Sequence, residues 1–471
     1  MIGISIRKSV LIMTTRILPR PYESSLRRQV LRLALPAVGE QFLNMLVGLT
    51  DVYLVGHLTA TAVAKLGYGP AEGLAGIGLA NYVVWIITTI FMAGAVGTTA
   101  LIARATGAQE QGEANNILRQ SLLLGAVIGI VGGLLMYSTA GAALQLFGAA
   151  PDVAALGKRV LHISAVSMPL AGIMFVLNAA LRGAGDTKTP LLIMILVNGI
   201  NMLLSWLLVN GYLGFPTMGV AGAAWGSTIS RIIGGIVVVG LLLRGCGSLQ
   251  LDLLPRPHGN TLMRILRVGL PTGAEMLAFQ SALVVYARFV TNLGTVPYAA
   301  HNTVITAESI SFLPGLGFAV AATTLVGQSL GAEDPQRARR SGHEAYIQSA
   351  VFMGIMGVLF VIMPEFFLSL LVDDPEVVAA GVLPLRLVGI IQPLLAANFV
   401  YAGALRGAGD TRWPLLIKLV SPWLVRVPLA IWLIPLYGLT GAWIAMSIDL
   451  AVQGVLALWR FRGSAWERIK V

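Results

Sequence analysis

Apolar residues in this chain gather into blocks of about 20, separated by short polar segments. A helix of that length rises 1.5 Å per residue and crosses a hydrocarbon core of about 30 Å. Lipid offers no hydrogen bonds to the backbone, so such blocks are expected to be α-helices. The pattern predicts an all-α polytopic membrane protein with 12 transmembrane helices, at residues 33–56, 71–97, 117–137, 157–180, 190–209, 219–243, 268–293, 298–326, 345–363, 379–405, 414–434 and 438–459.

A repeated motif divides these helices into two equal sets. Residues 181–193 read LRGAGDTKTPLLI and residues 405–417 read LRGAGDTRWPLLI, so 11 of 13 positions agree at an offset of 224. LPAVGE and LPTGAE match at an offset of 235, and Gly219 matches Gly438 at an offset of 219. Because six crossings return the chain to its starting side, we expect two like-oriented six-helix lobes around a central cleft, an arrangement typical of alternating access.

The repeat also sets the expected domain bounds. They are a cytoplasmic N-terminal extension (1–32), an N-terminal lobe (33–243), a cytoplasmic linker (244–267), a C-terminal lobe (268–460) and a cytoplasmic tail (461–471). Residues 1–22 are basic, as in some targeting sequences, but they contain no long apolar core followed by a small-residue cleavage site. We therefore interpret them as part of the extension.

Charge is scarce and unevenly placed. Only 11% of residues are charged, against roughly 25% in soluble proteins. The net charge of +11 does not indicate nucleic acid, because most arginines and lysines fall in the loops on one side, which identifies that side as cytoplasmic. We expect a multi-pass protein of the cell's inner (plasma) membrane with both termini in the cytoplasm. Its expected partners are the lipid bilayer and a small-molecule substrate, with no nucleic acid, and it is expected to be a monomer.

Acidic residues inside the apolar blocks carry the functional information, because a central Asp costs about 2.5 to 3.5 kcal/mol on insertion scales. Asp51 lies deep in the first block, where such an acid can bind and release a proton or Na⁺. Asn198, Asn201 and Ser205 in the fifth block are its expected partners, and Asn201 and Ser205 share a helix face. An alternative role fits these residues equally well, namely hydrogen bonding between neighbouring helices.

Other intramembrane polar residues allow more than one interpretation. Glu275, Glu308, Asn198 and Asn178 are candidates for lining a substrate cavity. Glu40 and Glu275 are repeat-equivalent, so they serve packing or helix entry as readily as transport. Arg288 is a candidate to neutralise one of these acids. Other charges within the helices are either paired or reach toward an interface: Arg231, Lys418, Arg426 and Asp449.

The two LRGAGDT segments are interpreted as structural. Each is predicted to end a helix, so Arg182 and Arg406 would favour the negative helix end, while Asp186 and Asp410 would open the turn before the next helix.

Motifs for catalysis are missing from the sequence. The five histidines are scattered, and no zinc-protease motif, GxGxxG or Walker loop occurs. The single cysteine, Cys246, has no partner for an intramolecular disulfide and is interpreted as an inert thiol. We expect no enzyme activity, no metal and no cofactor, and with no nucleotide site transport would be driven by an ion gradient.

Taken together, the chain resembles the multidrug and toxic compound extrusion (MATE) family over about residues 30 to 460. The resemblance is carried by TDVYLVG, the paired LRGAGDT segments, GVAGAAW and the run AAHNTVITAESISFLPGLGF. It implies a two-lobed antiporter that exports amphipathic, often cationic, compounds in exchange for H⁺ or Na⁺. Asp51 matches the family's first-helix Asp, thought to take the coupling ion, and Asn201 matches an Asn beside it.

The chain departs from one branch of that family. Ser205 stands where the branch has a second Asp, and Phe279 stands where a Na⁺-coupled branch has a Glu. No acid occurs between Arg386 and Leu405, where that branch has an Asp in the tenth helix. The resemblance therefore implies an ion-coupled antiporter that uses H⁺ rather than Na⁺. The alternatives are a lipid-linked precursor flippase of the same superfamily, which would need a cationic cavity, and an intramembrane enzyme.

Overall fold

The computed structural model describes residues 25–251 and 257–469. The expected N-terminal extension lies outside the described residues up to residue 24, and α1 already begins at Leu26. The N-terminal lobe contains α1 (Leu26–Gly56), α2 (Ala60–Leu66), α3 (Pro70–Gly107), α4 (Gln111–Leu146), α5 (Pro151–Gly183), α6 (Lys188–Asn210) and α7 (Val220–Arg244), with a 3₁₀ turn at Tyr212–Gly214.

The C-terminal lobe begins with α8, whose first residue is Gly259. This lobe contains α8 (Gly259–Thr291), α9 (Thr295–Gly331), α10 (Pro335–Ile362), α11 (Pro364–Ser369), α12 (Pro375–Ile390), α13 (Gln392–Gly407), α14 (Arg412–Ser421), a π turn (Pro422–Arg426) and α15 (Val427–Arg462), with a last 3₁₀ turn at Ala465–Arg468.

Twelve membrane crossings are present in the described part of the chain, but two differ from simple rods. Nine α-helices from α1 to α10, α2 excepted, are long and apolar enough to span. The predicted helix at 379–405 is instead two helices, α12 and α13, bent by 57° at Ile391. The last stretch, Arg412–Arg462, is 51 residues long, about twice what one crossing needs. Gly438 breaks it into two crossings.

Gly438 also shows the internal repeat in the backbone. It has φ 57° and ψ −132°, and its repeat partner Gly219 has φ 53° and ψ −127°. A side chain disfavours positive φ, so glycine suits this reversal at both positions. The repeat expected from the sequence is therefore present as a repeated turn.

Small residues let helices approach closely within the N-terminal lobe. A Cβ added to Gly129 of α4 would lie 2.5 Å from the Met168 carbonyl oxygen, and one added to Gly172 of α5 would lie 2.6 Å from the Gly125 carbonyl oxygen. Such contacts replace the hydrophobic driving force that is lacking between helices in lipid. These glycines of α4 and α5 therefore serve helix packing.

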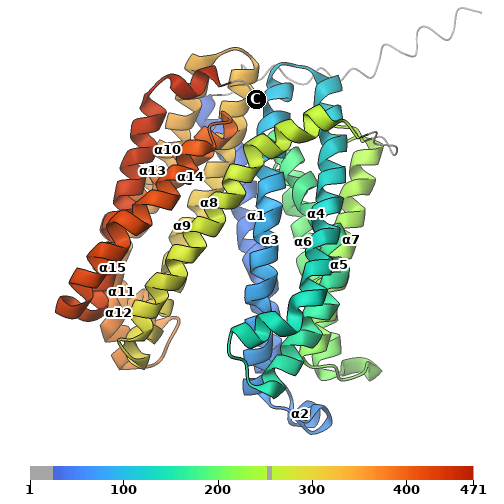
Figure 1. The fold of residues 1–471 in the computed structure, drawn as a ribbon, viewed down its shortest axis with the longest axis vertical. Coiled ribbons are helices and arrows are strands. Elements are labelled where there is room, and N and C mark those ends of the chain that lie inside the picture. The colour runs from blue at the N-terminus through green and yellow to red at the C-terminus, as the bar shows by residue number, and fades with distance from the viewer. Residues whose placement is uncertain (1–24, 252–256, 470–471) are drawn as a thin grey trace, which may run out of the picture.

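The two lobes meet at one end of the bundle and spread apart at the other, as Figure 1 shows. We call these the closed end and the open end. At the closed end Arg104 Nη2 donates to the Ala408 carbonyl at 2.8 Å, and Gln328 Nε2 donates to the Gly183 carbonyl at 3.0 Å. Arg104 and Gln328 are repeat-equivalent, at the offset of 224, so the two contacts are related by the pseudo-symmetry of the lobes.

Candidate functional site: a buried carboxylate in each lobe

Asp51 lies near the open end of α1 and receives hydrogen bonds from two neighbouring helices. Its Oδ1 accepts from Asn201 Nδ2 at 3.2 Å and from Ser205 Oγ at 3.0 Å, both on α6. Its Oδ2 accepts from Ser227 Oγ of α7. Asp51 is 7% exposed, and Asn201 and Ser205 are fully buried. Every hydrogen-bond donor to this carboxylate among the described residues is neutral.

The shell around Asp51 is itself connected. Asn201 Nδ2 also lies 3.2 Å from Ser205 Oγ and 3.1 Å from Ser227 Oγ. Asn201 Oδ1 is buried without a hydrogen-bond partner, and a polar atom in that state calls for a water or a ligand. One turn beyond Ser227, Arg231 adds a positive charge that acts on Asp51. The arrangement can hold a carboxylate that exchanges a proton or another small cation.

The structure brings together some of the predicted site residues and separates others. Asp51, Asn201 and Ser205 form one cluster. Asn198 instead donates to the Leu43 carbonyl at 3.0 Å and the Met194 carbonyl at 2.8 Å, so it ties α6 to α1. Asn178 is buried in α5, and its Oδ1 has no hydrogen-bond partner. Neither amide donates to Asp51.

Ser227 is the member of this cluster that the sequence interpretation missed. It lies in the segment WGSTISR of α7, where two serines, a threonine and Arg231 interrupt an apolar run. That interruption was the available signal. Sequence alone did not show that α7 turns this face toward α1.

Glu40 and Glu275 form matching ion pairs in the two lobes. Arg182 Nη1 lies 2.6 Å from Glu40 Oε1, and Arg406 Nη2 lies 2.6 Å from Glu275 Oε1. Both members of each pair are repeat-equivalent. The interpretation of Arg182 and Arg406 as helix-end charges was therefore incomplete, because each ties the fourth long helix of its lobe to the first.

Asp449 is the buried carboxylate of the C-terminal lobe, and it has a cationic partner. Arg426 Nη2 lies 2.8 Å from its Oδ2, and the two side chains are 1% and 0% exposed. Gln453 Nε2 donates to Oδ2 at 2.8 Å, and Ser421 Oγ donates to Oδ1 at 2.5 Å. Of the two interpretations that the sequence left open for Asp449 and Arg426, pairing is confirmed.

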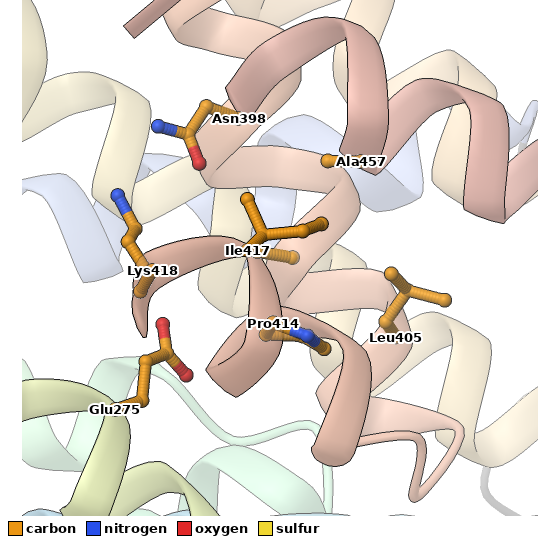
Figure 2. A pocket seen from close by; sticks show the side chains of 8 residues that line it. Glu275, Asn398, Leu405, Pro414, Ile417, Lys418 and Ala457 are labelled. Carbon is orange, nitrogen blue, oxygen red and sulfur yellow. The ribbon is translucent and has the colours of Figure 1, made fainter. Parts of the chain in front are cut away.

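The polar network continues from Asp449 toward the closed end. Gln453 Oε1 accepts from Lys418 Nζ at 2.7 Å and from Asn398 Nδ2 at 3.1 Å. Lys418 and Asn398 line a narrow pocket together with Glu275 (Figure 2). Glu308, on α9, is 6% exposed, and the charge of Arg426 acts on it. Glu275 and Glu308 thus lie in one lobe, Glu275 beside Arg406 and Lys418, and Glu308 within the influence of Arg426.

No group of three or more histidine, cysteine, aspartate or glutamate side chains that could hold a metal ion occurs within residues 25–251 and 257–469. The groups present at Asp51 and along the C-terminal network are carboxylates, cationic side chains, amides and hydroxyls. Such groups bind, orient and exchange protons.

A comparison with family models decides the assignment. A model described as MatE matches residues 36–207 and 271–432, most of the chain and one match in each lobe. The chain belongs to the MATE family.

Curated relatives extend the match over nearly the whole length. The probable multidrug resistance protein NorM of Thermotoga maritima is 32% identical over 455 residues, covering 96% of this chain and 95% of the relative. The uncharacterized transporter YisQ of Bacillus subtilis is 24% identical, covering 92% of this chain and 93% of the relative. The first relative is named as a multidrug resistance protein and the second as a transporter, and the chain is a multi-pass membrane protein of the MATE family.

Solved structures share the fold. A MATE crystal structure described as the bent conformation has a TM-score of 0.85 at 22% identity, covering 94% of this chain and 97% of that one. A MATE transporter described as outward-facing has a TM-score of 0.84 at 22% identity, covering 95% and 98%. The 12-helix, two-lobed fold expected from the sequence is confirmed.

Proposed function

We propose that this MATE-family protein is an H⁺-coupled antiporter that exports amphipathic, often cationic, drugs or metabolites by alternating access. The observation that carries the proposal is the Asp51 carboxylate, buried near the open end and held by neutral donors. Intramembrane carboxylates of this kind mark proton and ion pathways. The relatives named as multidrug resistance proteins support drugs as the substrate class.

The shell of Asp51 favours a proton over Na⁺. A sodium ion needs several oxygen ligands in place of its hydration shell. Here one carboxylate is present, Ser205 supplies a hydroxyl in place of a second acid, and three donors already occupy Asp51. The positive charge of Arg231 further disfavours a bound metal cation. A proton needs only one oxygen of Asp51.

The basic residues support an orientation with the closed end in the cytoplasm. Arg104, Arg182 and Arg406 lie at that end, and cytoplasmic loops of membrane proteins are rich in arginine and lysine. The structure then represents an outward-facing state, because its open end lies on the external side. Both termini would be cytoplasmic and the membrane would be the plasma membrane. We propose that the protein acts as a monomer.

In the proposed cycle, Asp51 faces the outside in this state and takes a proton, which favours release of a cationic substrate. The contacts at the closed end then separate, the open end closes, and Asp51 loses its proton to the cytoplasm. The charged carboxylate favours a new cationic substrate, and the lobes return to the outward-facing state.

A flippase for lipid-linked precursors is not favoured by the charges. It would need a cluster of free cations for phosphate groups, whereas of the three basic residues around Glu275 and Asp449 only Lys418 has no carboxylate partner among the described residues.

Dye efflux from proteoliposomes under separately imposed gradients tests the proposal. Purified protein is reconstituted with ethidium inside, and a pH gradient or a Na⁺ gradient of equal size is applied. We expect the pH gradient to drive efflux and the Na⁺ gradient to leave it at the level of protein-free vesicles. Efflux driven by Na⁺ alone would contradict proton coupling, and efflux driven by neither would contradict ion-coupled export.

A further inference from the structure

Lys418 differs from the other basic residues that surround Glu275 and Asp449. Arg406 is ion-paired with Glu275 and Arg426 with Asp449. The Lys418 ammonium instead donates to the neutral amide of Gln453 at 2.7 Å and lies 4.9 Å from the centroid of the Phe279 ring. Among the described residues no carboxylate lies within 4.0 Å of it. It is the cation of this network without a direct ionic partner.

Each element that packs against α14 contributes one charged group that acts on Lys418. Glu275 on α8 and Asp449 on α15 attract its charge, and Arg426 of the π turn and Arg406 on α13 repel it. Figure 2 shows Lys418 between Glu275 and Asn398 at the edge of the pocket. The Lys418 residue is half-buried. The two negative and two positive neighbours cancel, so the net charge of the whole group is the charge of the Lys418 ammonium.

The fold does not require a lysine at this place. At the offset of 224, the position equivalent to Lys418 is Met194, a buried apolar residue of α6. The N-terminal lobe therefore builds the same helix with a methionine. An intramembrane charge that the fold itself does not need is a candidate for function.

Chemistry separates Lys418 from the arginines beside it. Arginine keeps its proton in any protein environment, whereas a lysine in a low-dielectric site can lose it, because burial disfavours the ammonium. The neutral amide of Gln453 can bond either form of the amine, since its carbonyl accepts from NH₃⁺ or NH₂. Lys418 is thus the cation of the network that can change charge without breaking an ion pair.

We propose that Lys418 is a second proton-exchanging group, located in the C-terminal lobe. Its ammonium gives a proton to water when an organic cation occupies the space between the lobes, and its amine takes a proton back when the cation leaves. This inference rests on the proposed cation/H⁺ exchange and adds a proton to it beyond that of Asp51.

Repulsion through the protein is sufficient for such a response. Two unit charges about 8 Å apart at an effective dielectric constant of about 20 change an equilibrium constant by about thirtyfold. The organic cation therefore acts on Lys418 without touching it. Loss of the Lys418 proton in turn strengthens binding of the cation, because the coupling between two ligands is reciprocal.

Proton release on binding tests the inference directly. Tetraphenylphosphonium is added to the purified protein in weakly buffered detergent at pH 7.5, and released protons are counted with a pH dye against bound cation. We expect Lys418→Arg, which keeps the charge but not the exchangeable proton, to release about one proton fewer per bound cation than wild type. Lys188→Arg, at an exposed lysine that begins α6, is the matched control and should release as many protons as wild type.

A second variant covers the case in which the larger guanidinium disturbs packing. Lys418→Met places at this position the methionine that the N-terminal lobe has. The number of protons released per bound tetraphenylphosphonium, taken from the pH dependence of the affinity, should be about one lower than in wild type. Equal proton release by wild type and Lys418→Arg, with equal linkage in Lys418→Met, would overturn the inference and leave the proposed function intact. A wild type that binds the cation without releasing any proton would contradict both.

Discussion

The two lobes share one backbone fold, but their buried carboxylates have different partners. Asp51 in the N-terminal lobe is held by an amide and two hydroxyls, whereas Asp449 in the C-terminal lobe is held by Arg426. The same contrast recurs at repeat-equivalent positions: Asp186 contacts Thr189 and Cys246, and Asp410 is paired with Arg460. A neutral shell leaves a carboxylate free to exchange a cation, and an ion pair fixes it.

One pair of positions is alike in both lobes. Glu40–Arg182 and Glu275–Arg406 have the same 2.6 Å contact and the same place in the repeat. We infer that what the lobes share serves the fold, and that what differs between them serves exchange. The predictions that follow test this division.

The largest effect is expected from breaking the Arg426–Asp449 pair. Arg426→Met leaves the Asp449 carboxylate buried without its cation, which costs about 3 to 5 kcal/mol. The apparent melting temperature in detergent should fall by many degrees, and Arg288→Gln, at an exposed arginine of α8, should leave it unchanged. The double variant Arg426→Met with Asp449→Leu should recover most of the loss. A melting temperature for Arg426→Met equal to wild type would show that this carboxylate is not fixed by its ion pair.

A smaller and equal effect is expected at the shared pair. Glu40→Gln and Glu275→Gln each remove a charge-assisted contact, with a cost of about 1.5 to 3 kcal/mol. The two variants should melt at similar temperatures, and neither should lose affinity for tetraphenylphosphonium, as measured by titration calorimetry. Loss of affinity in Glu275→Gln alone would support the sequence-based hypothesis that Glu275 lines a substrate cavity.

Adding one methyl group at the closed end should move the two lobes apart there. A Cβ at Gly331 would lie 2.1 Å from the Arg104 carbonyl oxygen, so Gly331→Ala pushes α9 away from α3. Spin labels at Gln111 and Gln336, exposed on different lobes, should report a longer mean distance by pulsed electron paramagnetic resonance. Gly199→Ala, where an added Cβ meets nothing within 4 Å, is the control. An unchanged distance in Gly331→Ala would contradict a tightly packed closure.

The smallest effect is expected at Cys246, which lies outside the membrane-spanning helices. Burial, followed by the charge of Asp186, raises the pKa of this thiol. Less thiolate at neutral pH means slow reaction with a maleimide, and the rate should rise as the pH rises. Asp186→Asn removes the charge but keeps a side chain that can accept from the Lys188 and Thr189 amides. The variant should react a few-fold faster in a stopped-flow assay; a slower reaction would mean that Asp186 is not raising the thiol's pKa.

Much of the fold could be predicted from the sequence because lipid imposes few choices. Apolar length identifies spans, and the LRGAGDT repeat gave the two lobes and the matching turns at Gly219 and Gly438. The break between α12 and α13 was missed, although Gln392 and Pro393 follow Ile391 and a proline favours the first turn of a new helix. The short helices α2 and α11 lie in loops, where hydropathy carries no signal.

The site was predictable where one helix carried the evidence. Asn201 and Ser205 were predicted together because residues four apart share a helix face. Asp51 was predicted because a carboxylate inside the membrane is costly. Ser227 and the Arg426–Asp449 pair depend on how helices far apart in the sequence rotate toward one another. The two glutamate–arginine pairs could have been found by applying the repeat to both partners at once, since each residue has its equivalent at a fixed offset.

The most direct test of this account is coupled efflux by Asp51→Asn in proteoliposomes. The asparagine keeps the size and much of the hydrogen bonding but cannot take up a proton. We predict that ethidium efflux driven by a pH gradient falls at least about a hundredfold, in line with the loss of an essential proton-transfer group. Reconstitution and melting temperature should stay near wild type, and Asp152→Asn, at an exposed acid of α5, should retain full efflux. Full gradient-driven efflux by Asp51→Asn would contradict the assignment of the exchanging carboxylate to the N-terminal lobe.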